Sequence, residues 1–356
     1  MNTTKRKSAF TLVELLVVIG IIALLISILL PSLQSARRSA NTVKCSSNIR
    51  SILQGMQLYA AENNGFFPGG PNTSARFSYV DPQATPISVG SDANGEYGDD
   101  NYPNLVGMFD YISPIASVLG IEFNRGATVA DRSERFQQLR DVSIFNCPEN
   151  EFLAVPFGGG AADFEVGALV SYNTSMVFHL KHNDTGGNSG GNGVGRSKSR
   201  TDWNVPQGYS PQIARIGGAS DKMYLADGAR YSRSTIEPDF STSPYSSYGG
   251  AFSDQGAPFR FSNAWDRENA PGSGGGDDGV DARVYAYRHG GDPGDRVMKA
   301  NFGFFDGHVE TLGDLEGADP NMWVPEGTSL NVAGNQMWQD VIDTYYDGVE
   351  GVYIAK

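Results

Sequence analysis

A single apolar stretch near the N-terminus constrains this chain more than any other feature. Residues 10–30 contain one charged side chain, Glu14, and no proline, and the basic segment Lys-Arg-Lys at 5–7 precedes them. A helix rises about 1.5 Å per residue, so this run spans about 30 Å, the thickness of the hydrocarbon core of a bilayer. The sequence therefore predicts a membrane-spanning helix over residues 10–30.

The surroundings of this stretch argue against a secretory signal peptide. The apolar run is too long for one, and no small-x-small cleavage site follows it. Instead, the small residue Ala9 precedes the run. Because basic residues remain on the cytoplasmic side of a membrane, we expect a single-pass protein with its N-terminus in the cytoplasm and the rest of the chain outside it.

The segment from Ala9 to Ile19, AFTLVELLVVI, resembles the prepilin cleavage and methylation motif of type IV pilins and type II secretion pseudopilins. This resemblance implies an inner-membrane protein that a prepilin peptidase cleaves between Ala9 and Phe10, with N-methylation of Phe10. It also implies that Glu14 pairs with the free amine of Phe10 on a neighbouring subunit. Two opposite charges in lipid offset each other's desolvation only by pairing. The residue before the cut is usually Gly in that motif, whereas this chain has Ala9.

The pattern changes after Pro31 to an apolar stripe at helical spacing, which runs from Leu33 to Tyr59 with cationic residues between its members. Asn63-Asn64-Gly65 then form a helix stop signal. The expected organisation is a leader peptide at 1–9, a transmembrane helix at 10–30, its amphipathic continuation at 31–63, and an extracytoplasmic head at 64–356.

A second resemblance begins at Cys45, where Cys-Ser-Ser-Asn-Ile-Arg is similar to a stretch of a large family of pilin-like bacterial proteins. That family carries a C-terminal signature of His, nine residues, then Asp-Gly. Residues 285–312 contain His289 and Asp306-Gly307 with 16 residues between them, which an enlarged turn accommodates. The two resemblances together imply an α+β, pilin-like fold in which the long N-terminal helix packs on an antiparallel β-sheet with large loop-rich insertions.

Local patterns predict several elements of the head. Residues 132–139 have the pattern of a helix, and 142–148 alternate like a strand that stops at Pro148. Residues 166–180 have the pattern of one or two strands. A strand at 223–230 contains Asp227-Gly228, the favoured sequence for a two-residue hairpin turn, and residues 300–310 form a hairpin by the same criterion.

The chain has two cysteines, Cys45 and Cys147. Outside the cytoplasm such a pair can be oxidised. A bond between them would close a loop of about 100 residues, which contributes up to about 4.7 kcal/mol in the chain-entropy model, and it would join the helix to the head. The alternative is two buried free thiols, since a sequence does not supply the Cα separation.

Few residues point to catalysis or metal binding. His289, Asp306 and His308 are candidate metal ligands, two imidazoles and one carboxylate, but their spacing matches no metal motif. We favour a structural role, in which these side chains make hydrogen bonds that hold the last hairpin to the sheet. No nucleophile elbow, phosphate-binding loop or dinucleotide fingerprint occurs, so we expect neither an enzyme nor a cofactor.

An acidic loop offers one further ligand site. Asp277, Asp278 and Asp281 supply the oxygen ligands that Ca²⁺ prefers, although they do not match an EF-hand, and an acidic solvated loop is the commoner outcome. The net charge of −13 argues against a nucleic-acid partner, because phosphate binding requires clustered Lys and Arg.

These features predict a structural subunit that assembles with other pilin-like subunits into a filament or a secretion pseudopilus. The alternative is a membrane-anchored head that binds a glycan or a Ca²⁺-dependent surface partner and does not polymerise. The two hypotheses differ in whether Glu14 meets a neighbouring amine.

Overall fold

The computed structural model describes most of the N-terminal helix and the core of the head. The described residues are 11–69, 110–126, 129–150, 171–179, 203–228, 253–254, 287–290, 299–313, 315–331, 343–346, 349 and 351–356.

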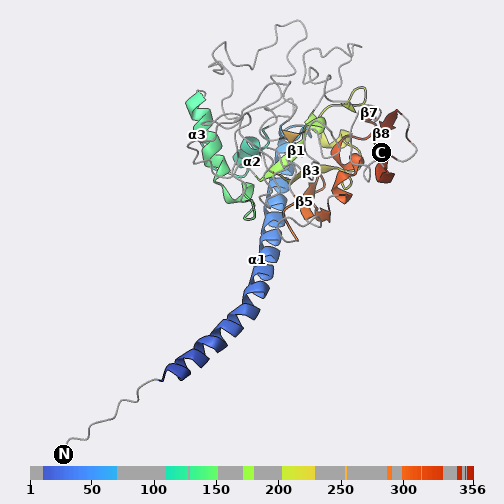
Figure 1. The fold of residues 1–356 in the computed structure, drawn as a ribbon. Coiled ribbons are helices and arrows are strands. Elements are labelled where there is room, and N and C mark those ends of the chain that lie inside the picture. Colours follow the sequence, from blue (N-terminus) through green and yellow to red (C-terminus); the bar gives the residue numbers. More distant parts are fainter. Residues whose placement is uncertain are drawn as a thin grey trace, which may run out of the picture.

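The longest element is α1 (Leu12–Glu62), a single helix of 51 residues that contains Pro31. It begins after Thr11, which forms a capping box with Glu14, and it ends at Asn63. Asn64 and Gly65 follow with φ values of 54° and 80°, as expected for a helix stop signal. The predicted membrane helix and its amphipathic continuation are therefore one element, which curves as it leaves the head (Figure 1).

The two halves of α1 have opposite surroundings. The large apolar side chains from Leu12 to Leu33 are exposed, and among the described residues α1 is the one helix that is long and apolar enough to cross a membrane. The second half instead carries a buried stripe that packs into the head. This stripe consists of Cys45, Asn48, Ile49, Ile52, Leu53, Gly55, Met56, Tyr59 and Ala60.

The main sheet has the strand order β4-β1-β3-β5-β6. Its strands are β1 (Tyr172–Ser175), β3 (Met223–Asp227), β4 (Ser253–Asp254), β5 (Lys299–Phe304) and β6 (Val309–Gly313). β1, β3, β5 and β6 pair antiparallel, and β4 pairs parallel to β1. This arrangement of a long helix and an antiparallel sheet confirms the predicted α+β, pilin-like fold.

Smaller elements surround this helix and sheet. A three-stranded sheet near the C-terminus has the order β2-β7-β8. Its strands are β2 (Trp203–Asn204), β7 (Ser329–Asn331) and β8 (Val352–Ile354). The other α-helices are α2 (Ile112–Val118), α3 (Val129–Arg140) and α4 (Pro320–Trp323). In Figure 1, α2 and α3 lie on one side of α1, and β3, β5, β7 and β8 lie on the other.

Several local predictions are confirmed and two are wrong. The helix predicted at 132–139 and the hairpin at 300–310 correspond to α3 and to β5–β6. The region 142–148 was predicted to be a strand, but it contains a 3₁₀ turn, Ser143–Phe145. The buried side-chain amide of Asn48 donates hydrogen bonds to the carbonyl groups of Ser143 and Asn146. That pairing bends the segment around α1 and removes carbonyls from any strand ladder.

The second wrong prediction is the hairpin turn at Asp227-Gly228. β3 lies between β1 and β5, so both of its edges are already paired and a hairpin partner has no place beside it. Within the region 166–180, predicted to hold one or two strands, the described residues 171–179 contain one strand, β1, followed by a 3₁₀ helix, Met176–His179.

Close packing of β5 on α1 depends on a glycine. A Cβ at Gly303 would lie 2.5 Å from Ile49 Cγ2 and 3.0 Å from Leu53 Cδ1. Both side chains are fully buried, so they have little room to move away. Gly303 therefore sets how closely the helix approaches the sheet.

We expect Gly303→Ala to lower the free energy of unfolding of the head by about 1–3 kcal/mol, the usual cost of overpacking a core. Urea unfolding of the full chain in detergent measures this change. Gly313→Ala, on β6, is the control, because a Cβ there meets its nearest neighbour, Glu316 Oε2, at an ordinary 3.5 Å. Equal stability losses in the two variants would contradict the packing argument.

His179 is a fully buried imidazole in the core of the head. Its ring lies edge-on to Phe67, with 5.3 Å between ring centroids, and its Nε2 lies 3.2 Å from Thr174 Oγ1. Burial disfavours the charged form and lowers the pKa of His179 from 6.5 to about 3. The folded protein therefore keeps this side chain neutral at moderately acidic pH.

This pKa predicts acid destabilisation below pH 6.5. The unfolded chain binds a proton at His179 that the folded chain does not, so stability falls by up to about 1.4 kcal/mol per pH unit between pH 6.5 and about 3. His179→Gln removes this proton uptake. Urea unfolding of the parent protein and of His179→Gln at several pH values measures the effect. The free energies of unfolding of the two proteins should converge as pH falls and differ by a constant amount above pH 7. A constant difference at every pH would exclude the effect.

Candidate functional site

The N-terminal end of α1 presents one carboxylate at the start of an exposed apolar surface. Glu14 Oε2 accepts hydrogen bonds from Thr11 N and Thr11 Oγ1, both at 2.8 Å. Glu14 N in turn donates to Thr11 Oγ1 at 3.3 Å. The carboxylate is thus turned back toward the helix N-terminus, where the helix dipole favours negative charge. The predicted processing residues Ala9 and Phe10 lie outside the described residues.

A disulfide joins α1 to the head. Cys45 and Cys147 are bonded, with 5.1 Å between their Cα atoms. The bond spans 102 residues of sequence, and it ties the buried half of α1 to the segment that follows the Ser143–Phe145 turn. The Cα–Cα distance, which a sequence does not supply, fits a disulfide and rules out the alternative of two free thiols.

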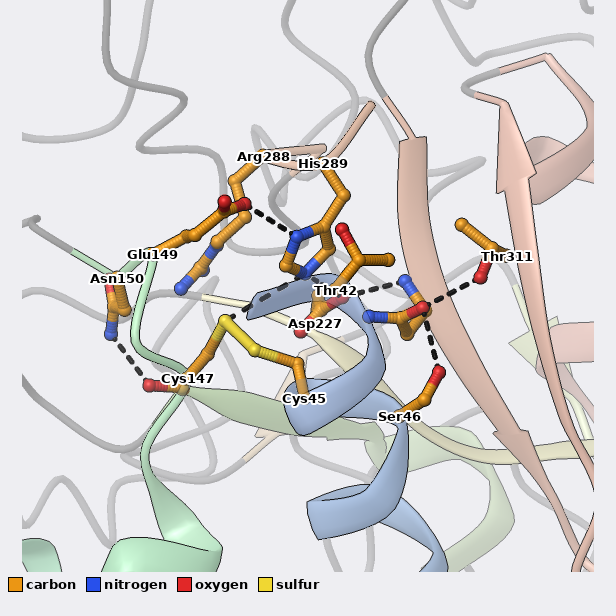
Figure 2. A network of polar contacts seen from close by, with 12 residues as sticks. Thr42, Cys45, Ser46, Cys147, Glu149, Asn150, Asp227, Arg288, His289 and Thr311 are labelled. Atoms are coloured by element: carbon orange, nitrogen blue, oxygen red, sulfur yellow. Dashed lines mark hydrogen bonds and ion pairs between the residues drawn. A yellow bond between two sulfur atoms is a disulfide. The ribbon is translucent and has the colours of Figure 1, made fainter. Parts of the chain in front are cut away.

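A buried histidine lies against the disulfide, between two carboxylates (Figure 2). His289 Nδ1 lies 2.7 Å from Glu149 Oε2, and His289 Nε2 lies 3.1 Å from Asp227 Oδ2. The same Nε2 lies 3.7 Å from Cys147 Sγ. The side chains of His289 and Asp227 are fully buried, and that of Glu149 is 12% exposed.

This geometry favours the imidazolium form of the histidine. Burial by itself lowers the pKa of His289, but the charge and hydrogen bond of Asp227, together with the hydrogen bond of Glu149, outweigh it and raise the pKa to about 9. Each ring nitrogen then donates to a carboxylate. The charged imidazole offsets part of the cost of burying two negative groups.

Backbone pairing holds this histidine in place. His289 and Lys299 exchange backbone hydrogen bonds of 2.9 and 2.7 Å, which attaches the histidine to the start of β5. Asp227, at the end of β3, accepts a 2.6 Å hydrogen bond from Asn301 N. The Asn301 side chain in turn accepts from Ser46 on α1 and Thr311 on β6. The buried charges are therefore connected to helix and sheet together.

The candidate metal ligands predicted from the sequence do not converge. His289 lies at the start of β5, whereas Asp306 and His308 lie in the turn after its end. His308 Nδ1 is 2.6 Å from Asp306 Oδ1, and both side chains are more than one-third exposed. The acidic loop with Asp277, Asp278 and Asp281 is outside the part of the chain that the structure describes.

The sequence does not reveal the two carboxylates that contact His289. Asp227 precedes a glycine, and because Asp-Gly is a strong hairpin signal, it predicts a turn at this position and not a buried charge. Glu149 follows Cys147-Pro148, and that proximity to a cysteine is the one local signal that points to it. Their meeting with His289 depends on the strand order, in which β3 lies beside β5.

Comparisons with known proteins agree with the N-terminal motif. A family profile described as "Prokaryotic N-terminal methylation motif" matches residues 4–30. The type IV wide pilus major component PilA4 of Thermus thermophilus is 34% identical over 86 residues, which are 24% of this chain and 56% of that protein. The chain thus spans just over half of the length of this curated relative. No solved structure matches.

The chain therefore carries a prepilin-type N-terminal methylation motif and is similar to a type IV pilin, as predicted. Together with the apolar half of α1, this motif indicates a single-pass, membrane-anchored protein. The profile ends at residue 30, so the C-terminal signature assigned to residues 285–312 stays a prediction.

We expect His289→Leu to lower the free energy of unfolding of the oxidised protein by about 3–5 kcal/mol, because it removes the cation that faces the buried carboxylate of Asp227 and the partly buried carboxylate of Glu149. Denaturant unfolding at pH 7 measures this loss. His308→Leu is the matched control: its ring is one-third exposed, so its cost should stay within about 0.5 kcal/mol. Similar losses in both variants would exclude a special role for the buried ion pairs.

Proposed function

We propose that this chain is a pilin-like structural subunit. In this proposal a prepilin peptidase cleaves it between Ala9 and Phe10, the helix at 10–30 anchors it in the inner membrane, and it assembles with other pilin-like subunits into a filament or a secretion pseudopilus. The observation that carries the proposal is an exposed apolar half-helix with one carboxylate near its start, within the matched motif at 4–30.

The exposed half of α1 supports assembly on physical grounds. Its apolar side chains have no partner within the described part of the head, so they require lipid before assembly and neighbouring helices after it. Glu14 is costly in either apolar setting unless a cation faces it. Cleavage before Phe10 would create that cation on each neighbouring subunit, as a free amine.

The orientation of Glu14 supports the same role. Its carboxylate is directed toward the N-terminal end of α1 by Thr11, the residue directly after Phe10. A neighbouring amine that approaches this end would meet the carboxylate without any rearrangement of the helix. In the single chain, the Thr11 donors satisfy part of its hydrogen-bonding capacity.

The size of the head bears on its role. The 86 matched residues are 24% of this chain but 56% of PilA4, so this chain is more than twice as long. We propose that the basic segment 5–7 holds the N-terminus in the cytoplasm and that the enlarged head is displayed outside it. A subunit that is anchored and displays this head without polymerising is the alternative, and the two experiments below distinguish them.

The first experiment tests processing. We expect mass spectrometry of the membrane-extracted protein to find an N-terminus at methylated Phe10. Ala9→Gly, which restores the usual residue of the motif, should give the same N-terminus. A chain that begins at Met1 in cells containing an active prepilin peptidase would contradict the proposal and favour the anchored, non-polymerising head.

The second experiment tests assembly and separates charge from helix capping. Glu14→Gln keeps the capping box, because Gln can replace Glu there, but it removes the charge. We expect it to remain in the membrane fraction and to lose filaments or cross-linked oligomers almost completely. Thr11→Val instead removes the hydroxyl group of the helix cap and keeps the charge of Glu14. We expect this variant to assemble.

Glu62→Ala, an exposed carboxylate at the other end of α1, is the charge control and should assemble normally. Normal assembly of Glu14→Gln would rule out pairing between subunits. Assembly lost in Thr11→Val but kept in Glu14→Gln would instead assign the effect to the helix cap.

A further inference from the structure

Four potential metal ligands meet at the junction of α1 with the sheet. They are Cys45 of α1, Cys147, Asp227 at the end of β3, and His289 beside the start of β5. One ligand atom from each, two sulfurs, one carboxylate oxygen and one ring nitrogen, lies within 4.8 Å of the other three, and all four residues are buried. Figure 2 shows the imidazole ring and the Asp227 carboxylate beside the two sulfur atoms.

The chemistry of this set fits one class of ion. Thiolate, imidazole and carboxylate are the ligands of tetrahedral Zn²⁺ sites, and four protein ligands close the coordination shell of a structural site. Thiolates disfavour Ca²⁺ and Mg²⁺, which require oxygen ligands. Its two sulfur ligands thus distinguish this site both from the acidic loop, which offers carboxylates, and from the exposed Asp306–His308 pair.

The groups around the four ligands resemble the outer hydrogen-bonding shell of known metal sites. In such sites a ligating histidine usually donates its second ring N–H to a carboxylate, which orients the ring. His289 Nδ1 makes this contact with Glu149 Oε2 at 2.7 Å, so its Nε2 faces the sulfur of Cys147 and Asp227. Asp227 Oδ2 is likewise held by Asn301 N.

An incompletely satisfied carboxylate also points to a bound cation. Asp227 is fully buried, and its Oδ1 has no hydrogen-bond partner among the described residues. A buried carboxylate oxygen without a partner is costly, and such atoms in folded proteins often mark a bound water or ion. A cation between this carboxylate and the two sulfurs would satisfy it.

We propose that reduction of the Cys45–Cys147 disulfide converts this cluster into a Zn²⁺ site with Cys45 Sγ, Cys147 Sγ, His289 Nε2 and Asp227 as ligands. Two electrons and two protons from a phosphine–water or dithiol reductant break the S–S bond and form two thiols. Zn²⁺ then displaces both thiol protons and the proton on His289 Nε2 to solvent. The disulfide and the metal are alternative ways to close the same junction between α1 and the head, and neither depends on polymerisation.

The test uses the full-length protein in detergent, reduced with a phosphine under anaerobic conditions and titrated with Co²⁺ as a spectroscopic probe. We expect one equivalent to produce thiolate-to-cobalt charge-transfer bands in the near ultraviolet and tetrahedral d–d bands in the visible. One equivalent of Zn²⁺ should abolish both, and the oxidised protein should show neither. Absence of these bands in the reduced protein, or an octahedral spectrum without charge transfer, would overturn the proposal.

Variants assign the ligands. Glu149→Gln keeps the contact to His289 but removes its charge, and it should weaken Co²⁺ affinity about 10- to 100-fold, the usual effect of changing such a partner. Asp227→Asn should weaken it at least as much while keeping a similar shape. His308→Ala, outside the cluster, should bind as the parent does. Unchanged affinity in both Glu149→Gln and Asp227→Asn would overturn the assigned ligand set.

A second readout does not depend on any variant. Zn²⁺ should slow alkylation of both thiols in the reduced parent protein by at least tenfold, measured by intact mass, because metal-bound thiolates are held at the site. Equal alkylation rates with and without Zn²⁺ would contradict thiolate ligation.

Discussion

Backbone hydrogen bonding within one uninterrupted helix allows this chain to occupy two environments. A segment in lipid must satisfy its polar backbone groups internally, and α1 does so from Leu12 onward. The same helix continues to Glu62, and there its buried stripe, from Cys45 to Ala60, forms part of the hydrophobic core of the head. Anchor and core are consequently parts of one element, because the helix that contains the apolar segment also supplies buried side chains to the head.

The contacts at the head end of α1 also determine the rotation of the helix. The Asn48 amide donates to the carbonyls of Ser143 and Asn146 and to the Tyr172 hydroxyl, and the Cys45 disulfide lies three residues earlier. Gly303 permits close approach of the sheet on a neighbouring part of the helix surface. Since each contact is directional, sliding or rotating α1 would break several of them together. The direction in which Glu14 leaves the helix is therefore coupled to the orientation of the head.

The charges at this junction are favourable only in one arrangement of the surrounding segments. Removing His289, Asp227 and Glu149 from water costs free energy that their mutual attraction offsets only when the geometry is correct. That geometry requires α1, the Cys147 segment, β3 and the start of β5 to meet as observed (Figure 2). The proposed exchange between a disulfide and a metal ion would preserve the same meeting of segments, so it would change the chemistry of the junction and leave its topology intact.

Local patterns in the sequence predicted α1 with its stop at Asn63, helix α3 and the β5–β6 hairpin, because periodic burial and turn residues report local backbone structure. They failed at two places where contacts from distant segments decide the structure. Residues 142–148 do not form a strand, because Asn48 on α1 binds their carbonyl groups. Asp227 does not begin a hairpin turn, because β1 and β5 already occupy both edges of β3.

The sequence alone thus determined the apolar helix, the single carboxylate within it and the methylation motif, since these depend on residues next to one another. The meeting of Cys45, Cys147, Asp227 and His289 was decided only by the tertiary structure, because strand order and helix rotation place side chains together that are up to 244 positions apart in the chain.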